Sequence, residues 1–184
     1  LANAPDGYFD SIIFYFNGHG MADTNGDARL IFNNTSARDD NSLLSTSMRV
    51  QEVVDYLEGS GSSSNFLFLE ACRSTTPPGS HGMEIIQAPN ISSYTPSSNT
   101  FITMAAQHGE ESFDHPTLET GIFTRSLITS LTGNADGNND GYVSFAELSG
   151  HLNDEIFALG WETDTTIDQE PEFIAANLNS NAVI

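Results

Sequence analysis

The sequence predicts an α/β fold in which neighbouring strands run parallel and are joined by helices. Residues 10–16 and 65–69 form two short apolar runs with the length and composition of buried strands. Between them, residues 47–57 place four aliphatic side chains on one face at helical spacing. A strand, a helix and a second strand in this order form a crossover unit of a parallel sheet.

The rest of the chain continues the alternation of strands and helices. The expected elements are a strand at 100–105, a helix at 121–131, a helix at 145–159 and a strand at 172–176. Residues 73–99, rich in Ser, Thr and Pro, are expected to form a long surface loop that often carries function in proteins. With 184 residues and no internal repeat, we expect one domain spanning 1–184.

The charge balance is strongly acidic. The chain has 25 Asp and Glu against 5 Arg, no Lys, and a net charge of -20. Such a surface repels phosphate backbones and anionic lipid heads, so nucleic acid and membranes are poor partners, whereas cationic substrates and metal cations are favoured. Solubility or a salt-rich habitat explains the same charge equally well.

A single cysteine, Cys72, excludes an internal disulfide and a multi-thiolate zinc site. It leaves a free thiol, present either as core filler or for its chemistry. No stretch approaches the length of a membrane span, and the first ten residues lack the regions of a signal peptide, so a cytoplasmic location is expected. Because the chain lacks an initiating Met, we expect it to begin inside a longer protein.

Cys72 and His19 each follow a predicted strand, and we expect both just past the strand ends. In open parallel sheets, functional groups gather beyond the carboxyl ends of the strands, so the two residues can meet if their strands are neighbours. A thiol attacks a carbonyl as thiolate, and imidazole can take that proton and return it to the leaving amine. The backbone amides of Gly20 and Cys72 can stabilise the oxyanion. A buried structural cysteine remains the alternative.

Three stretches of sequence together resemble caspases and metacaspases. They are Phe-Tyr-Phe-Asn-Gly-His-Gly at 14–20, Phe-Leu-Phe-Leu-Glu-Ala-Cys-Arg-Ser at 66–74, and Ala-Gln-His-Gly-Glu-Glu-Ser at 106–112 followed by Gly-Ile-Phe-Thr at 121–124. Caspases carry a similar Cys motif with the catalytic His about 50 residues upstream.

The resemblance implies a caspase-like three-layer α/β/α sandwich with a mostly parallel central sheet. It also implies a cysteine endopeptidase with Cys72 and His19 as the dyad and Gly20 with Cys72 as the oxyanion hole. Family members open with a strand, a helix and further elements before the His-bearing strand, whereas only nine residues precede Asp10 here. The chain's own N-terminal fragment or an activating subunit is therefore an expected partner. Bacterial relatives suggest a role in cell death or antiphage defence.

The resemblance also assigns the residues that select the substrate. The position two before the nucleophile lies in the primary specificity pocket of this family, and here it is Glu70. A carboxylate there pairs with a guanidinium and repels an acidic side chain, so we predict a protein or peptide substrate cleaved after Arg, with Lys as a second choice. Asn17 is the next pocket residue. The alternative is that Glu70 only ends a strand and is solvated.

Arg-directed cleavage also implies self-processing. Any exposed residue among Arg29, Arg38, Arg49 and Arg73 is a candidate site.

Residues 136–147 match the EF-hand calcium loop at its diagnostic positions. The predicted Ca²⁺ ligands are Asp136, Asn138, Asp140, the Tyr142 carbonyl, Ser144 and Glu147, and Gly141 supplies the sharp turn. A calcium-free Asn/Gly turn is the alternative. No organic cofactor is expected.

Two other functions remain open. The first is an inactive caspase-like domain that binds calcium and regulates a partner. The second is a related peptidase of gingipain or legumain type, which shares the His-Gly and Cys features, although the calcium-type loop and the Glu-Ala-Cys-Arg-Ser stretch favour the caspase branch.

Overall fold

The structure is a computed structural model. It describes residues 11–23, 27–36, 38–72, 96–97, 99–107, 112–113, 120–162, 169–177 and 181–184. The predicted loop at 73–99 lies almost entirely outside these residues.

Within these ranges, six strands form one sheet in the order β3-β2-β1-β4-β5-β6. Their bounds are β1 Ser11–Ala22, β2 Ala28–Ile31, β3 Met48–Arg49, β4 Ser64–Cys72, β5 Thr100–Met104 and β6 Glu172–Ala175. The central strands β1, β4 and β5 are parallel, and the pairings that add β2, β3 and β6 are antiparallel. The predicted parallel core of the sheet is therefore confirmed.

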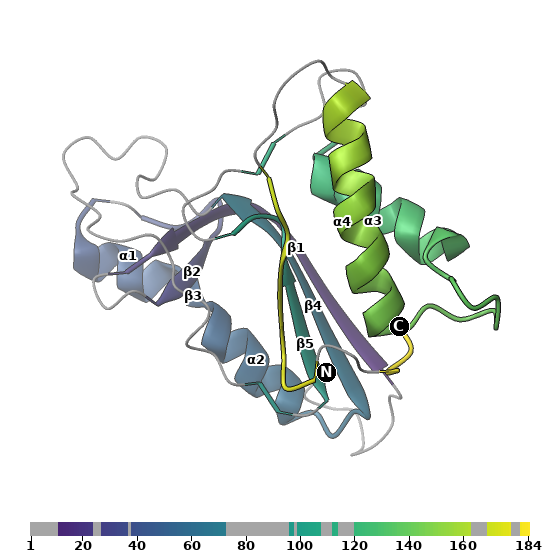
Figure 1. The fold of residues 1–184 in the computed structure, drawn as a ribbon. Helices are drawn as coiled ribbons and strands as arrows, with labels where there is room; N and C mark the ends of the chain where they lie inside the picture. The colour runs from purple at the N-terminus through teal and green to yellow at the C-terminus, as the bar shows by residue number, and fades with distance from the viewer. Residues whose placement is uncertain are drawn as a thin grey trace.

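Helices cover both faces of this sheet. Their bounds are α1 Asp40–Thr46, α2 Val50–Glu58, α3 Ile122–Thr129 and α4 Phe145–Glu162, and a π-helical turn, η2 Ser130–Asn134, extends α3. Figure 1 shows α2 on one face of the sheet and the α3–α4 pair on the other. This arrangement is the three-layer α/β/α sandwich that the sequence motifs implied.

Strand β4 supplies side chains to two separate cores because its successive residues point to opposite faces. Phe66 and Phe68 belong to an aromatic core with α3 and α4, in which the Phe101 and Phe145 rings lie 4.7 Å apart. Leu67 and Leu69 pack against the apolar face of α2. Burial on both faces is typical of a central parallel strand.

The first strand is longer than predicted, and the expected polar loop after it holds further elements. β1 continues through Asn17, His19 and Gly20 to Ala22, because its last four residues pair with β2. Helix α2 begins at Val50 rather than near Ser47, because the two residues before it form β3 on the edge of β2. The expectation that His19 and Cys72 lie just past strand ends was therefore wrong, because Cys72 is itself the last residue of β4.

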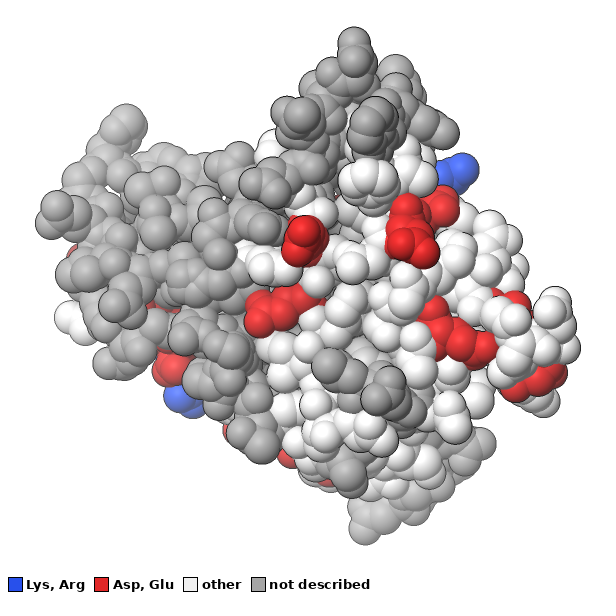
Figure 2. All heavy atoms as spheres, viewed as in Figure 1, with Lys and Arg blue, Asp and Glu red and all other residues white. Residues whose placement is uncertain are grey.

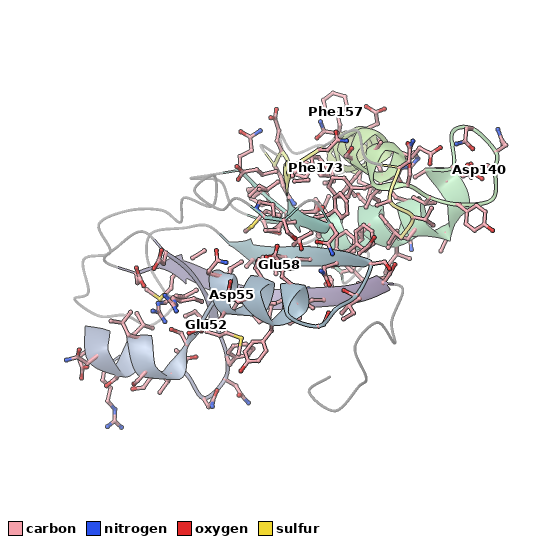
Figure 3. All side chains as sticks on the ribbon, turned by 90° about the horizontal axis from the view of Figure 1, so that it is seen from below. Glu52, Asp55, Glu58, Asp140, Phe157 and Phe173 are labelled. Carbon is pink, nitrogen blue, oxygen red and sulfur yellow. The ribbon has the colours of Figure 1, made fainter. Side chains whose placement is uncertain are left out.

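The acidic surface is visible on individual elements. Glu52, Asp55 and Glu58 lie three residues apart along α2 (Figure 3), and Glu58 accepts a hydrogen bond from the Ser97 N–H at 2.8 Å. On the face shown in Figure 2, acidic side chains are far more prominent than basic ones. None of the helices in the described ranges has the length and apolarity needed to cross a membrane.

Candidate active site

The pairing of β1 with β4 brings the predicted site residues together. Their parallel register runs from Ser11 opposite Ser64 to His19 opposite Cys72, and Asn17 lies opposite Glu70. Neighbouring strands lie about 4.8 Å apart, so each pair of backbones is one strand spacing apart. His19 and Cys72 are thus the last pair of the parallel ladder, at the carboxyl end of β4 and three residues before the end of β1, and the His19 side chain is exposed.

Gly20 follows His19 within β1 and lies opposite Leu30 of β2. Its backbone is therefore at the same edge of the sheet as the His19 and Cys72 pair. The catalytic and oxyanion roles of these three residues stay predictions.

Glu70 is buried, with 4% of its surface exposed, so the alternative of a solvated strand end is wrong. One carboxylate oxygen, Oε2, accepts a hydrogen bond from Asn17 Nδ2 at 3.0 Å. The same oxygen lies 3.2 Å from the Tyr15 hydroxyl and also accepts from Thr124 Oγ1. The other oxygen, Oε1, accepts from the Thr124 backbone N–H at 3.4 Å. Asn17 and Glu70, predicted separately as pocket residues, are in direct contact.

The ion pairs found in the described part of the chain do not include Glu70. A buried carboxylate without a counter-ion depends on hydrogen-bond donors and nearby dipoles for its stability. Here it lies at the N-terminus of α3, where the backbone N–H groups carry partial positive charge. Hydrogen-bond donors and the end of a helix, rather than an ion pair, therefore surround the Glu70 carboxylate.

Tyr15 completes the surroundings of Glu70. Burial raises the pKa of the Tyr15 phenol; the charge of Glu70 raises it further, while hydrogen bonding with Thr124 and Asn17 acts in the opposite direction. The net shift is upward, so Tyr15 remains a protonated donor at neutral pH. Its oxygen lies 2.5 Å from Thr124 Oγ1.

Sequence analysis missed three residues of this site: Tyr15, Thr124 and Gly121. Tyr15 lies two positions before Asn17 on the same strand, so the period of two could have placed it on the same face. Gly121 and Thr124 were noted as a motif at the start of a helix but not as contacts of Glu70. A Cβ on Gly121 would overlap the Glu70 carboxylate, so only glycine allows this approach.

The candidate self-processing residues differ in exposure. Arg29 is buried and ion-paired with Asp23 at 2.8 Å, so the expectation of an accessible site fails there. Arg49 is half-buried and Arg38 is exposed. Arg73 lies outside the described residues.

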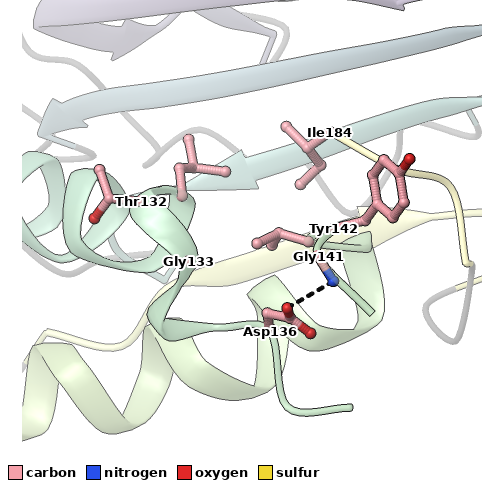
Figure 4. A pocket seen from close by; sticks show the side chains of 8 residues that line it. Thr132, Gly133, Asp136, Gly141, Tyr142 and Ile184 are labelled. Atoms are coloured by element: carbon pink, nitrogen blue, oxygen red, sulfur yellow. Dashed lines mark hydrogen bonds between the residues drawn. The ribbon is translucent and has the colours of Figure 1, made fainter. Parts of the chain in front are cut away.

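The predicted calcium loop has a compact set of internal hydrogen bonds. Asp136 accepts from the backbone N–H group of Asp140 at 3.1 Å and from that of Gly141 at 2.9 Å, and the second of these hydrogen bonds is drawn in Figure 4. Asn138 Oδ1 accepts from the same Asp140 N–H at 2.8 Å, which places the Asp136 and Asn138 oxygens side by side. Gly141 has a φ of 87°, a conformation that favours glycine at the turn.

Glu147 closes the loop and also lies in the first turn of α4. Its Oε2 accepts from the Ser144 N–H at 3.0 Å, while its own N–H donates to Ser144 Oγ at 3.3 Å, which is a capping box. Its Oε1 lies 3.4 Å from the Asn138 N–H across the loop. Hydrogen bonds from the Ser144 backbone and hydroxyl lower the pKa of Glu147. The Ser-x-x-Glu pattern at 144–147 could have predicted this cap.

The donor set of the loop consists of oxygens, which suits a hard cation such as Ca²⁺. Asp136, Asn138, Asp140 and Glu147 would supply side-chain oxygens, and Tyr142 would supply its carbonyl. Among the described residues, no three His, Cys, Asp or Glu side chains are already clustered as metal ligands. A cation in this loop would therefore need amide, carbonyl and carboxylate oxygens together.

A pocket of about 430 Å³ adjoins the loop (Figure 4). Its lining consists of Leu131, Thr132, Gly133, Asp136, Gly141, Tyr142, Val143 and Ile184. Ile184 donates its N–H to the Val143 carbonyl at 3.0 Å, so residues 181–184 pair with the end of the loop. This pocket lies apart from His19 and Glu70.

The mostly parallel sheet covered by helices on both faces defines a class of protein, the three-layer α/β/α sandwiches. The family model of the Caspase domain matches residues 1–183, and the chain therefore belongs to this family, whose members are cysteine peptidases. Peptides and proteins are the substrates of such a domain.

Solved structures support the same fold. The caspase-1 of Spodoptera frugiperda superposes with a TM-score of 0.55 at 13% sequence identity, over 90% of this chain. The chain spans 60% of the length of that caspase. A comparison with curated proteins finds no matching sequence.

Proposed function

We propose that this protein is a cysteine endopeptidase that cleaves after Arg, and more slowly after Lys, with Cys72 as nucleophile and His19 as acid and base. The observation that carries the proposal is the register of β1 and β4, which pairs His19 with Cys72 at the carboxyl edge of the sheet. Membership of the Caspase domain family supports the peptidase chemistry.

In the proposed reaction, His19 takes the Cys72 proton and the thiolate attacks the scissile carbonyl. The Gly20 and Cys72 amides donate to the oxyanion that forms. His19 then protonates the leaving amine, which leaves an acyl group on Cys72. Water, deprotonated by His19, attacks the acyl group and releases the acid and the thiolate.

Preference for Arg is supported by Glu70. It is a buried carboxylate with hydrogen-bond donors but no ion-pair partner among the described residues, two positions before the dyad in the register. A guanidinium binds a carboxylate through two parallel hydrogen bonds, whereas an acidic side chain would meet like charge. Asn17 holds the Glu70 carboxylate and is proposed as the second substrate-binding residue.

Fluorogenic tetrapeptides ending in Arg, Lys or Asp test this proposal, with Cys72→Ala as the control. We expect cleavage after Arg, less after Lys, none after Asp, and loss of all cleavage in the control. Cleavage after Asp, or equal cleavage by Cys72→Ala, would refute the proposal.

We also propose that Ca²⁺ binds the loop at 136–147 and regulates activity. The all-oxygen donor set and the glycine turn at Gly141 support binding. An inactive calcium-binding regulatory domain is the second candidate function, and the same loop supports it. Running the peptide assay with and without Ca²⁺ separates the two, because only the peptidase gives turnover.

An upstream fragment of the protein or an activating subunit is the proposed partner, in a cell-death or defence pathway. Support comes from β1, which pairs with β2 only from His19 onward, so that among the described strands Ser11–Gly18 pair on one side alone. Ile13 in this segment is 53% exposed. Such an edge accepts an added strand through backbone hydrogen bonds.

A further inference from the structure

Glu70 occupies the place of a helix cap. Helix α3 has Gly121 at its N-cap position, and Gly121 has no side chain to accept a hydrogen bond from the first turn. Instead, Glu70 Oε1 accepts from the N–H of Thr124, the third helical residue, which is the donor that an N-cap side chain normally satisfies. A residue of strand β4 thus caps α3 from outside the helix.

The hydroxyl groups around Glu70 form an ordered chain. Tyr15 and Thr124 have one hydroxyl proton each, so both cannot donate to Glu70 while also sharing a hydrogen bond. The Tyr15 hydroxyl oxygen lies 2.5 Å from Thr124 Oγ1 and 3.2 Å from Glu70 Oε2. The shorter contact indicates that Tyr15 donates to Thr124, which donates to Glu70 Oε2.

This arrangement leaves part of the carboxylate available. An ionised carboxylate has about four acceptor sites. Asn17 and the Thr124 hydroxyl use Oε2, and the Thr124 N–H makes a longer bond to Oε1. Thr124 is the residue that contacts both oxygens, so it fixes the rotation of the carboxylate plane.

We propose that Thr124 is a positioning residue that orients the Glu70 carboxylate for two-point binding of a guanidinium, and so sets the preference for Arg over Lys. The capping of α3 by Glu70 does not depend on peptidase activity, whereas the preference for Arg over Lys rests on the proposed function. A guanidinium needs both carboxylate oxygens in a defined plane, while an ammonium is a point charge with little angular demand. Disturbing the plane of the Glu70 carboxylate should therefore weaken the binding of an Arg side chain more than the binding of a Lys side chain.

Kinetics with Arg and Lys tetrapeptides test the inference in Thr124→Val, which keeps the shape of the side chain but removes the hydroxyl. We expect kcat/KM for Arg to fall by roughly tenfold or more, mainly through KM, as for loss of one hydrogen bond to a charged group. The kcat/KM for the Lys tetrapeptide should change less, so the ratio of kcat/KM for Arg to kcat/KM for Lys should fall. Thr124→Ser, which retains the hydroxyl, should restore the ratio.

The matched control is Thr129→Val, the same substitution at the other end of α3, which should leave the ratio unchanged. If Thr124→Val keeps the wild-type ratio, or if Thr124→Ser narrows it equally, the inference is wrong even though the protein cleaves after Arg.

A binding assay separates this failure from failure of the proposed function. p-Aminobenzamidine, a fluorescent amidinium, is titrated into Cys72→Ala and into Cys72→Ala with Thr124→Val. Thermal unfolding checks that both are folded, and Thr124→Ala replaces Thr124→Val in the second variant if it is not. Tighter binding with threonine than with the residue that lacks the hydroxyl, together with equal binding with threonine and serine, supports the inference even if no peptide is cleaved. No binding to Cys72→Ala, equal binding to the valine variant, or weaker binding to the serine variant overturns it.

Discussion

Two buried carboxylates in this protein are stabilised by different means. Asp23 forms an ion pair with Arg29, and side-chain exposure is 2% and 9% respectively. Glu70 instead relies on hydroxyl, amide and backbone donors. The first charge is already neutralised by a partner, whereas the second has no ion-pair partner among the described residues. We therefore expect substitution of Arg29 to affect stability, and substitutions around Glu70 to affect binding.

Arg29→Met should destabilise the protein by about 3–5 kcal/mol, because it leaves the Asp23 charge buried without its partner. It also removes hydrogen bonds of Nη1 to the Leu44 carbonyl and Ser47 Oγ. Urea unfolding measures the effect. Arg38→Met, at an exposed position, is the control and should change the free energy of unfolding by less than about 0.5 kcal/mol. Equal effects of the two variants would contradict this account.

At the scale of elements, one pair of residues serves both a helix and a loop. Ser144 and Glu147 form the capping box of α4, and Glu147 also ends the proposed calcium loop. Without calcium, the cap alone explains why Glu147 is ordered. A test of whether Glu147 binds Ca²⁺ therefore requires variants that separate calcium binding from capping of α4.

Glu147→Gln and Ser144→Ala make this separation. Gln can replace Glu in a capping box, so the melting temperature of Glu147→Gln in chelator should change little, but Ca²⁺ affinity should fall by at least about tenfold because the bidentate charge is lost. Ser144→Ala should lower stability by about 1 kcal/mol through loss of the cap. Calorimetric titration and thermal unfolding measure both. Unchanged Ca²⁺ affinity in Glu147→Gln would mean that the loop is only a capped turn.

The pH dependence of Glu147 follows from its hydrogen bonds with Ser144, which hold its pKa below the ordinary 4.5. A depressed pKa stabilises the folded state fully above the ordinary value, and this contribution disappears as the pH falls through the folded pKa. In chelator, any difference in melting temperature between wild type and Glu147→Gln should therefore be constant above about pH 5 and vanish in stronger acid. A difference that grows on acidification would contradict the assignment.

At the scale of the whole molecule, the net charge of -20 imposes self-repulsion on the folded state. The acidic row of α2 and the other carboxylates seen in Figure 2 and Figure 3 contribute to it. The same field attracts a cationic substrate toward the protein. Stability and substrate capture should therefore respond to salt in opposite directions.

Raising NaCl from about 0.02 M to about 0.5 M, with chelator present, should raise the melting temperature because screening weakens the repulsion. Over the same range, kcat/KM for an Arg tetrapeptide should fall because attraction over long distances is screened. A tetrapeptide ending in citrulline, the neutral isostere of Arg, serves as the control in binding experiments. A melting temperature that falls with salt would show that repulsion between the carboxylates does not limit the stability of the folded protein.

The sequence by itself determined the central strands and the helices α2, α3 and α4, and it named Cys72 and His19 as candidate catalytic residues. Apolar runs of strand length and helical spacing arise locally, so they can be read without the fold. The calcium-type loop is likewise a contiguous pattern, and its hydrogen bonds lie within 136–147. The elements β2, α1 and β3 were missed because they are too short to show a periodic pattern, and their order depends on pairing with β1 and on the buried Asp23 to Arg29 contact.

Only the tertiary structure decided what surrounds Glu70. Glu70 lies 55 positions from Tyr15 and 54 positions from Thr124 in the sequence. Its contacts with them depend on the strand register and on where α3 packs. No local pattern specifies such distances, because a shift of one residue would turn the side chains to the other face. The sequence thus identified Glu70 as a candidate site residue. Packing of α3 against the sheet decided that this carboxylate is buried and that it caps α3.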